Sequence, residues 1–356
     1  MNIMFLLPRF VRSQSGGYKV VYEYANYLSR NGHNISLLFL NENALIRYHL
    51  PEFIRKALIN RMTDIGPRWF SLNTSIQRIS TYKNGYENQI KNNDVVIFTA
   101  IETIKYFNRF KDAHRVYFIQ DFENWNYNSE DVYKSYALGM VNVVVAKWLK
   151  EVVDKHSEMP SYLVSNCIDG TIFFDNKLQR RKHSIVFHYR SAPYKGSQYA
   201  IEVIEKLKMK YDDLIVDVIS TERRPNNLPE WCSFHHCVSA EKVAKINNKT
   251  QVFICTSVEE GFGLPGLEAM ACGCALASSS YKGVLEYAVD GVNALLSPVK
   301  DVNYMVDNVV KLFENEELRN VISQNGVKTG LDRSVDKSAK EFERVLVEET
   351  KRTKLE

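Results

Sequence analysis

The chain has little cysteine for its length and no long hydrophobic run. Its six cysteines among 356 residues show no paired C-x-x-C spacing, so we expect small buried hydrophobic side chains instead of disulfides or a zinc site. No stretch approaches the roughly 18 consecutive apolar residues of a membrane-spanning helix. The apolar opening is cut by Pro8 and Arg9, too early for the core of a signal peptide. The sequence therefore predicts a cytoplasmic protein.

Strong charge of one sign is also missing. The formal net charge is only +4, and a nucleic-acid-binding protein needs a denser basic stripe. The excess is confined to residues 1–168, which hold 20 Lys and Arg against 15 Asp and Glu, whereas the remainder holds 26 against 27. A mildly basic first half fits an anionic acceptor or an anionic membrane surface better than it fits nucleic acid.

One segment of this basic half has the spacing of an amphipathic helix. Apolar residues at 53, 54, 57, 58 and 62 fall on one helical face, and Arg55, Lys56 and Arg61 accompany them. We favour a helix that packs its apolar face on its own domain. The alternative is a helix that lies on a membrane surface, possible for a protein that visits the inner face of the cell membrane.

Strand-like and helical segments alternate along the whole chain, which exceeds the size of a usual single core. Strands are predicted at 2–7, 35–40, 94–98, 115–119, 142–145, 184–188, 214–219, 252–255 and 274–277, and the clearest helices at 17–30, 196–210 and 336–350. The fold class is therefore α/β, with two Rossmann-like doubly wound parallel-sheet domains facing a central cleft. We expect an N-terminal domain over 1–168, a C-terminal domain over 169–335, and a last segment, 336–356, that crosses back to the N-terminal domain.

The most informative segment is a glycine-rich turn that follows the strand at 252–255. It carries two glutamates, Glu260 and Glu268, and Pro265 and Gly273 bracket a short helix behind it. The free N–H groups at the start of such a helix suit an anion such as a phosphate. Two carboxylates beside a phosphate suit hydroxyl groups, so the turn indicates a nucleotide-activated sugar.

The same turn contains Gly261-x-Gly263-x-x-Gly266, the pattern of a dinucleotide-binding loop. In that loop the strand runs straight into the first glycine, and an acidic residue ends the next strand. Here five residues, 256–260, intervene, and the strand at 274–277 is followed by serines. We therefore disfavour an NAD-dependent oxidoreductase. An ordinary strand-turn-helix with surface glutamates remains an open alternative.

Two further turns follow predicted strands. Gly16 and Gly17 come after the first strand and open the first long helix, where they let a ligand approach the backbone. Arg190 and Lys195 follow the strand at 184–188. A bidentate donor and a point cation at a strand end suit the oxygens of a diphosphate.

Together these segments resemble the retaining family-4 glycosyltransferases of the GT-B fold. The resemblance covers about residues 5 to 345, and the turn from Glu260 to Glu268 is its most specific part. The supporting segments occur in the order that the family shows: Gly16-Gly17, Asn31-Gly32-His33, Asn166-Cys167-Ile168-Asp169, and Arg190 with Lys195-Gly196.

The resemblance implies a role for each of these residues. Glu260 binds hydroxyls of the transferred sugar, and Glu268 binds the ribose. Arg190 and Lys195 neutralise the diphosphate, helped by the N–H groups of Phe262, Gly263 and Leu264. Gly16 and Gly17 make room for the phosphate and the acceptor. It also implies that neither a metal nor a cofactor is needed, in agreement with the absence of a D-x-D triad from the sequence.

The chain departs from the family in one place. Many members have a histidine after the fourth strand, where this sequence reads Gln120-Asp121. That run is similar to a variant of surface-polysaccharide rhamnosyltransferases, and the resemblance implies that Gln120 and Asp121 face the sugar near its C6 side. An aspartate that caps the next helix is an equal alternative.

We thus expect a hexosyltransferase that uses a nucleotide-diphosphate sugar donor and a saccharide or lipid-linked glycan acceptor in cell-envelope polysaccharide synthesis. The alternatives are a UDP-hexose or UDP-N-acetylhexosamine donor in place of a deoxysugar nucleotide, and a non-catalytic sugar-binding protein.

Overall fold

The chain folds into two units, each built on its own parallel sheet. The computed structural model describes residues 1–124 and 126–352, without the side chains of Asn43 and Arg47. Unit 1 comprises Met1–Ser165 and Asp336–Glu356, and unit 2 comprises Asn166–Val335. The predicted fold class of two Rossmann-like doubly wound domains is confirmed.

The sheet of unit 1 has the strand order β3-β2-β1-β4-β5-β6-β7, with every neighbouring pair parallel. Its strands are β1 (Asn2–Leu7), β2 (Asn34–Phe39), β3 (Gln77–Ser80), β4 (Val95–Phe98), β5 (His114–Ile119), β6 (Val141–Val144) and β7 (Tyr162–Leu163). The order reverses between β1 and β4, and ligands of doubly wound sheets bind outside the carboxyl ends of the strands at such a point. Gly16 and Gly17 follow β1 and therefore lie at this end of the sheet.

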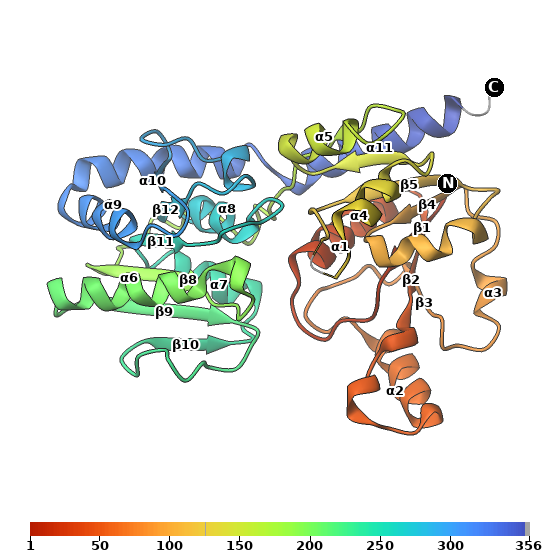
Figure 1. Cartoon of the computed structure of the whole chain (residues 1–356), viewed down its shortest axis with the longest axis horizontal. Helices are drawn as coiled ribbons and strands as arrows, with labels where there is room; N and C mark the ends of the chain where they lie inside the picture. Colours follow the sequence, from red (N-terminus) through yellow and green to blue (C-terminus); the bar gives the residue numbers. More distant parts are fainter. Residues whose placement is uncertain (125, 353–356) are drawn as a thin grey trace. The chain divides into compact units, whose positions relative to one another are not determined.

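Helices cover the strands of unit 1, and one of them comes from the far end of the chain. The helices are α1 (Gly16–Arg30), α2 (Glu52–Ile65), α3 (Tyr86–Gln89), α4 (Ser129–Tyr136), α5 (Lys147–Asp154) and α11 (Val335–Arg352), with 3-10 turns η1 (Asn41–Asn43), η2 (Ile46–Tyr48) and η3 (Ile101–Arg109). Phe342 of α11 contacts three buried rings, with centroids at 6.4 Å from Phe5, 4.9 Å from Tyr24 and 5.2 Å from Phe118. Helix α11 thus completes the core of unit 1 (Figure 1).

Unit 2 repeats the arrangement with the strand order β10-β9-β8-β11-β12-β13, also parallel throughout. Its strands are β8 (Ser184–His188), β9 (Ile215–Ser220), β10 (Ser233–His236), β11 (Val252–Cys255), β12 (Ala275–Ser279) and β13 (Ala294–Ser297). Its helices are α6 (Ser197–Lys210), α7 (Ala240–Asn247), α8 (Leu264–Ala271), α9 (Val302–Glu314) and α10 (Glu316–Leu331), with 3-10 turns η4 (Pro193–Lys195) and η5 (Val284–Glu286). The order reverses between β8 and β11, so the loops after these two strands adjoin.

Apolar side chains fill both faces of the unit 2 sheet. One cluster packs under α6 and α9, and a second packs under α7 and α8. Strands covered on both faces are continuous apolar runs. This explains why β8 and β11 are recognisable in the sequence.

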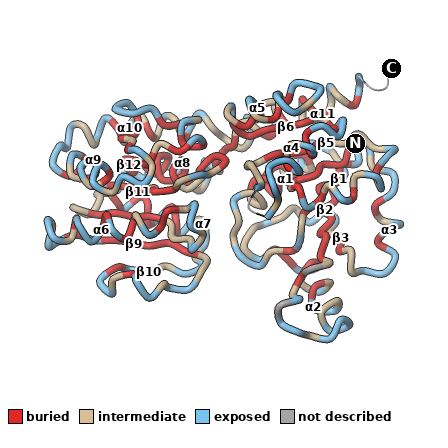
Figure 2. The backbone as a smooth tube through the Cα atoms, viewed as in Figure 1, coloured by how far each residue is buried: buried red, intermediate tan, exposed pale blue. Residues whose placement is uncertain are grey.

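Helix α2 corrects our favoured interpretation of its segment. The helix forms, but Phe53, Ile54 and Leu58 point to solvent and are 74%, 37% and 42% exposed. The residues that α2 buries are Ile59 and Thr63. The predicted apolar face therefore does not pack on its own domain, and Figure 2 shows the exposure of this helix.

Not all of the six cysteines are buried. Contrary to expectation, Cys237 is exposed and Cys255 is half-buried, whereas the other four cysteines are buried. Cys237 lies outside the core because it follows β10, at the edge of the sheet.

Within residues 1–124 and 126–352, no helix combines the length and the apolar character needed to cross a bilayer.

Candidate functional site

The turn between β11 and α8 is held in a conformation that requires glycine. Gly263 has φ +91°, a left-handed backbone, and a Cβ added there would lie 2.0 Å from the hydroxyl oxygen of Tyr281. The buried Tyr287 donates a hydrogen bond of 2.7 Å to the carbonyl oxygen of Gly263. Two buried tyrosines thus fix the start of α8.

The loops after β8 and β11 interlock. Gly196 has φ +62°, and a Cβ on it would lie 1.9 Å from the carbonyl oxygen of Thr256. The Thr256 hydroxyl donates to the carbonyl oxygen of Gly196 at 2.8 Å, and Val258 N–H donates to the carbonyl oxygen of Tyr194, also at 2.8 Å. This backbone contact brings Lys195 beside the glutamate-bearing turn, although the two are 65 residues apart.

Lys195 and Glu260 form an ion pair at this junction, with 3.4 Å between Nζ and Oε1. The Ser257 hydroxyl donates a second hydrogen bond of 2.5 Å to the same carboxylate oxygen. The Lys195 side chain is 27% exposed and that of Glu260 is 14% exposed, so both remain accessible to a ligand. Ser257 is a residue that the sequence analysis missed, and its only signal is its place two residues after a strand.

Arg190 is anchored at the carboxyl end of β8. Ser197, the first residue of α6, accepts from Arg190 N–H at 2.9 Å and donates to its carbonyl oxygen at 2.8 Å. The guanidinium Nη1 donates to the carbonyl oxygen of Tyr189 at 2.8 Å. Burial lowers the pKa of Arg190 below its ordinary value, and the carboxylates of Glu222 and Glu260 offset only part of this shift. The electrostatic influence of Glu260 places Arg190 in the same group of charges as Lys195.

His188 is a second residue that sequence reasoning missed. Burial, assisted by the charge of Arg190, lowers its pKa to about 3, so the imidazole is neutral at pH 7. Its Nε2 is buried without a hydrogen-bond partner among the described residues. The imidazole therefore adds no positive charge beside Arg190.

Glu268 is the fifth of the eight residues of α8, after its first turn, and is 8% exposed. The two predicted glutamates differ in setting: Glu260, in the turn, pairs with Lys195, whereas Glu268 belongs to the helix.

In unit 1 the structure brings Gln120 next to the first glycine turn. The Gln120 side-chain amide donates to the carbonyl oxygen of Gly17 at 3.3 Å. A Cβ on Gly17 would lie 3.3 Å from the same nitrogen, which is a tight contact. Gly16 begins α1 after Ser15. Asp121 accepts from the N–H of Phe122 at 2.9 Å, within its own loop. Gln120 and the glycine turn thus form one group.

Glu123, two residues further on, carries an unusual carboxyl group. Burial raises its pKa to about 8, and the charges of Asp121 and Glu102 add to the shift. The N–H of Ile101 and the hydroxyl of Tyr117 donate to its Oε2, the latter at 3.4 Å. The carboxyl is therefore mostly protonated at pH 7, and its sequence context gave no sign of this.

We expect Glu123→Gln to change the pH dependence of stability. The pKa of Glu123 is higher in the folded chain than its ordinary value of 4.5, so the folded state binds more protons between those values. The contribution of Glu123 is complete below about pH 4.5 and is lost as the pH rises towards 8. The free energy of unfolding of Glu123→Gln should therefore exceed that of the native chain by an increasing margin over this range, at most about 1.4 kcal/mol per pH unit. Urea unfolding at several pH values measures the margin.

Glu158→Gln, at an exposed position of the same unit, is the control and should follow the native chain at every pH. A constant difference between Glu123→Gln and the native chain from about pH 5 to pH 8 would show that Glu123 does not titrate as described.

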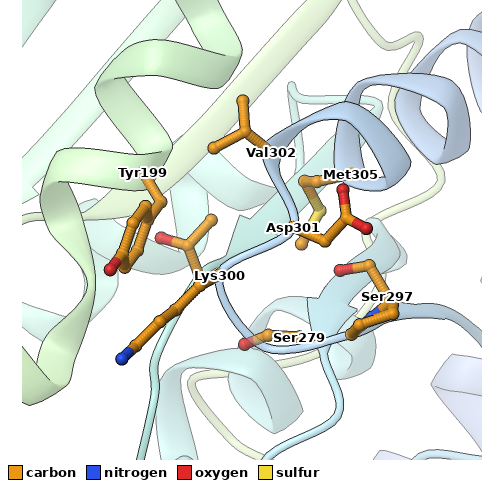
Figure 3. A pocket seen from close by; sticks show the side chains of 9 residues that line it. Tyr199, Ser279, Ser297, Lys300, Asp301, Val302 and Met305 are labelled. Carbon is orange, nitrogen blue, oxygen red and sulfur yellow. The ribbon is translucent and has the colours of Figure 1, made fainter.

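A small recess opens beside this site in unit 2 (Figure 3). It lies at the carboxyl ends of β11, β12 and β13, and its lining includes Tyr199, Thr256, Ser279, Ser297, Lys300 and Asp301. Its cavity volume is only about 10 Å³. Pockets for drug-sized ligands take about 300–1,000 Å³. The recess is therefore too small to account for binding of a nucleotide sugar.

The sequence of unit 2 matches a known family. Residues 169–329 match the family model described as Glycosyl transferases group 1. This segment covers most of Asn166–Val335. The family match therefore concerns unit 2.

Individual relatives agree with this match. An uncharacterized glycosyltransferase of Methanocaldococcus jannaschii is 24% identical over 188 residues, which are 52% of this chain and 52% of the relative. The N,N'-diacetylbacillosaminyl-diphospho-undecaprenol alpha-1,3-N-acetylgalactosaminyltransferase of Campylobacter jejuni is 26% identical over 97 residues, 27% of this chain and 26% of its own length. The chain thus matches about half the length of the first relative and about a quarter of the second.

Among solved structures, Anabaena HepE in complex with UDP-glucose has a similar fold. Its TM-score is 0.74 at 13% identity, over 98% of this chain and 100% of HepE. At this identity the likeness concerns the fold alone. The structural neighbours are GT-B glycosyltransferases, and the two parallel-sheet units described above have the same architecture.

Proposed function

We propose that this protein is a retaining, metal-independent glycosyltransferase that moves a hexosyl group from a nucleotide-diphosphate sugar to a saccharide acceptor. The observation that carries the proposal is the Lys195–Glu260 pair, 3.4 Å apart beside the start of α8. A cation, a carboxylate and free helix N–H groups in one place suit a diphosphate attached to a polyol. The family match of unit 2 supports the same class of reaction.

Each charged group has a task in the proposed reaction. Glu260 accepts hydrogen bonds from hydroxyls of the transferred sugar, and Glu268 accepts them from the ribose. Arg190 and Lys195 neutralise the diphosphate, together with the N–H groups of Phe262, Gly263 and Leu264. Fixed cations and dipoles that meet charge developing on the leaving group lower the barrier without reorganisation.

The bond changes follow a front-face route. The bond between the sugar C1 and the diphosphate oxygen breaks, and a bond from C1 to the acceptor oxygen forms on the same face. The departing diphosphate takes the proton of the acceptor hydroxyl. The configuration at C1 is therefore retained, and no covalent enzyme intermediate is required.

We further propose that unit 1 binds the acceptor. Gly16 and Gly17 leave room for the ligand at the carboxyl end of β1, and Gln120 holds this turn through its hydrogen bond to Gly17. Asp121 contacts the sugar from the adjacent loop. The acceptor in this proposal is a lipid-linked glycan of cell-surface polysaccharide synthesis. The diphospho-undecaprenol in the name of the Campylobacter relative supports such a class.

Two donors are candidates. Gln120 and Asp121 stand where related enzymes place a histidine, which favours a deoxysugar nucleotide without a 6-hydroxyl. The UDP-glucose bound to HepE favours a UDP-hexose instead.

A thermal-shift panel of UDP, GDP, dTDP and CMP, each with its common sugar conjugates, tests the proposal. A ligand at a hundredfold excess over its Kd stabilises the folded state by about 2.7 kcal/mol, which raises Tm by roughly 5–10 °C for a domain of this size. We expect one nucleotide and its sugar conjugate to give such a shift, equally with EDTA and with Mg²⁺. No shift with any member of the panel would refute a nucleotide-sugar enzyme.

A further inference from the structure

Helix α2 lies beyond the strands β2 and β3 (Figure 1). It presents large apolar side chains to solvent. Its outer face consists of Phe53, Ile54, Ala57, Leu58, Arg61, Asp64 and Ile65, all exposed. Phe53 is 74% exposed and Ile65 is 51% exposed. Ile46 and Tyr48 of η2, shortly before the helix, are 46% and 53% exposed. Six large apolar side chains within twenty residues are thus in contact with water.

The orientation of α2 is fixed by the opposite face of the helix. Ile59 and Thr63 are buried, and the side-chain amide of Asn60 donates to the carbonyl oxygen of Tyr82 at 3.3 Å. The cationic groups of Arg55 and Lys56 lie 6.0 Å from the centroid of the Tyr82 ring. The exposure of the outer face therefore does not result from a loosely attached helix. It is exposed because polar and cation–π contacts hold the helix with its apolar side outward.

The charges around the outer face are predominantly basic. Residues 46–68 contain five Lys and Arg and two acidic residues. Both acidic residues have a cationic neighbour: Glu52 is 2.7 Å from Lys56, and Asp64 is 3.7 Å from Lys83. Arg61 lies within the apolar face itself and is exposed. An apolar surface surrounded by uncompensated positive charge is complementary to anionic lipid and would repel a second copy of itself.

We propose that the outer face of α2, with Ile46 and Tyr48, docks on an anionic lipid bilayer. Phe53, Ile54 and Leu58 insert their side chains below the headgroups, and Arg61 extends its guanidinium to the lipid phosphates. The lipid contact does not depend on the proposed glycosyl transfer, since its partner is the bilayer itself. It gives a physical reason why the first half of the chain is basic.

Co-sedimentation with vesicles tests the contact. The native protein should pellet with vesicles of mixed phosphatidylglycerol and phosphatidylcholine at low salt, and much less with pure phosphatidylcholine or at high salt. The variant Phe53→Ser/Ile54→Ser/Leu58→Ser should partition at least about tenfold more weakly, because the three side chains supply the buried apolar area. Arg61→Gln alone should weaken partitioning roughly fivefold.

The matched control is Met209→Ser/Val321→Ser/Leu331→Ser in unit 2. These side chains are 82%, 47% and 58% exposed, so the variant loses as much exposed apolar surface elsewhere. It should pellet like the native protein. The proposal is overturned if the α2 variant pellets as well as the control. It is also overturned if sedimentation velocity shows a dimer that only the α2 variant loses while no form binds vesicles.

Discussion

Lys195→Ala is expected to lower kcat/KM by about 100- to 1,000-fold, the usual loss when one preorganised group that stabilises a developing anion is removed. Lys195 pairs with Glu260 beside the N-terminus of α8. Stability should hardly change, because an ion pair that is partly open to solvent contributes about 0–1 kcal/mol. Steady-state kinetics with the donor found in the thermal-shift panel, combined with Tm, measures both effects.

Glu260→Ala should abolish transfer in the same assay, because the sugar hydroxyls lose their carboxylate. Lys300→Ala is the matched control: Lys300 is an exposed cation of the recess in Figure 3, which is too small for the donor. It should retain native activity. Full activity of Lys195→Ala or Glu260→Ala, or equal losses in Lys300→Ala, would show that the roles are assigned wrongly.

Arg180→Ala is expected to cost about 3–5 kcal/mol in the free energy of unfolding of unit 2, because it removes one partner of a buried charge network. Arg180 Nη1 donates to the carbonyl oxygens of Asn247 and Thr250, each at 3.0 Å. Nη2 donates to the carbonyl oxygen of Cys272 at 2.7 Å and to the carboxylate of Asp175 at 3.1 Å. Without the guanidinium, three carbonyl groups and one carboxylate each lose a donor, although Asp175 keeps its hydrogen bonds from Lys177. Urea unfolding measures the loss.

Arg223→Ala provides the comparison, since Arg223 is exposed on the surface of the same unit. Substitutions at such positions usually change stability by less than about 0.5 kcal/mol. Similar unfolding midpoints for Arg180→Ala and Arg223→Ala would mean that water replaces the guanidinium at the three carbonyl groups.

The central strands were predictable because burial on both faces makes them continuous apolar runs. β1 and β11 are examples, with sequences NIMFLL and VFIC. The edge strands β3 and β10, with sequences QRIS and SFHH, were not predicted. Each is short and partly polar, and each pairs with a neighbour on one side only. Their extended conformation therefore depends on that neighbour more than on their own residues.

Periodicity predicted a helix near residues 53–62 but not the direction of its apolar face. A helical pattern identifies which residues share a face, whereas the packing of Ile59 and the contacts of Tyr82 decide which face is buried. The same limit applies to the site. The turn around Glu260 has a recognisable local pattern, but its pairing with Lys195 arises from the interlocked loops after β8 and β11. The neutral state of His188 depends on burial in the folded chain and has no local signal.

The placement of α11 in unit 1 affects the order in which the chain matures during its synthesis. Unit 2 is a continuous stretch, Asn166–Val335, so all of its residues are synthesised before Phe342 of α11. Unit 1 is translated first but lacks Phe342 until the last helix emerges, and its central rings stay uncovered for that time. Because partly folded units with exposed apolar surface aggregate, the first-made half of the protein is the half that needs protection longest.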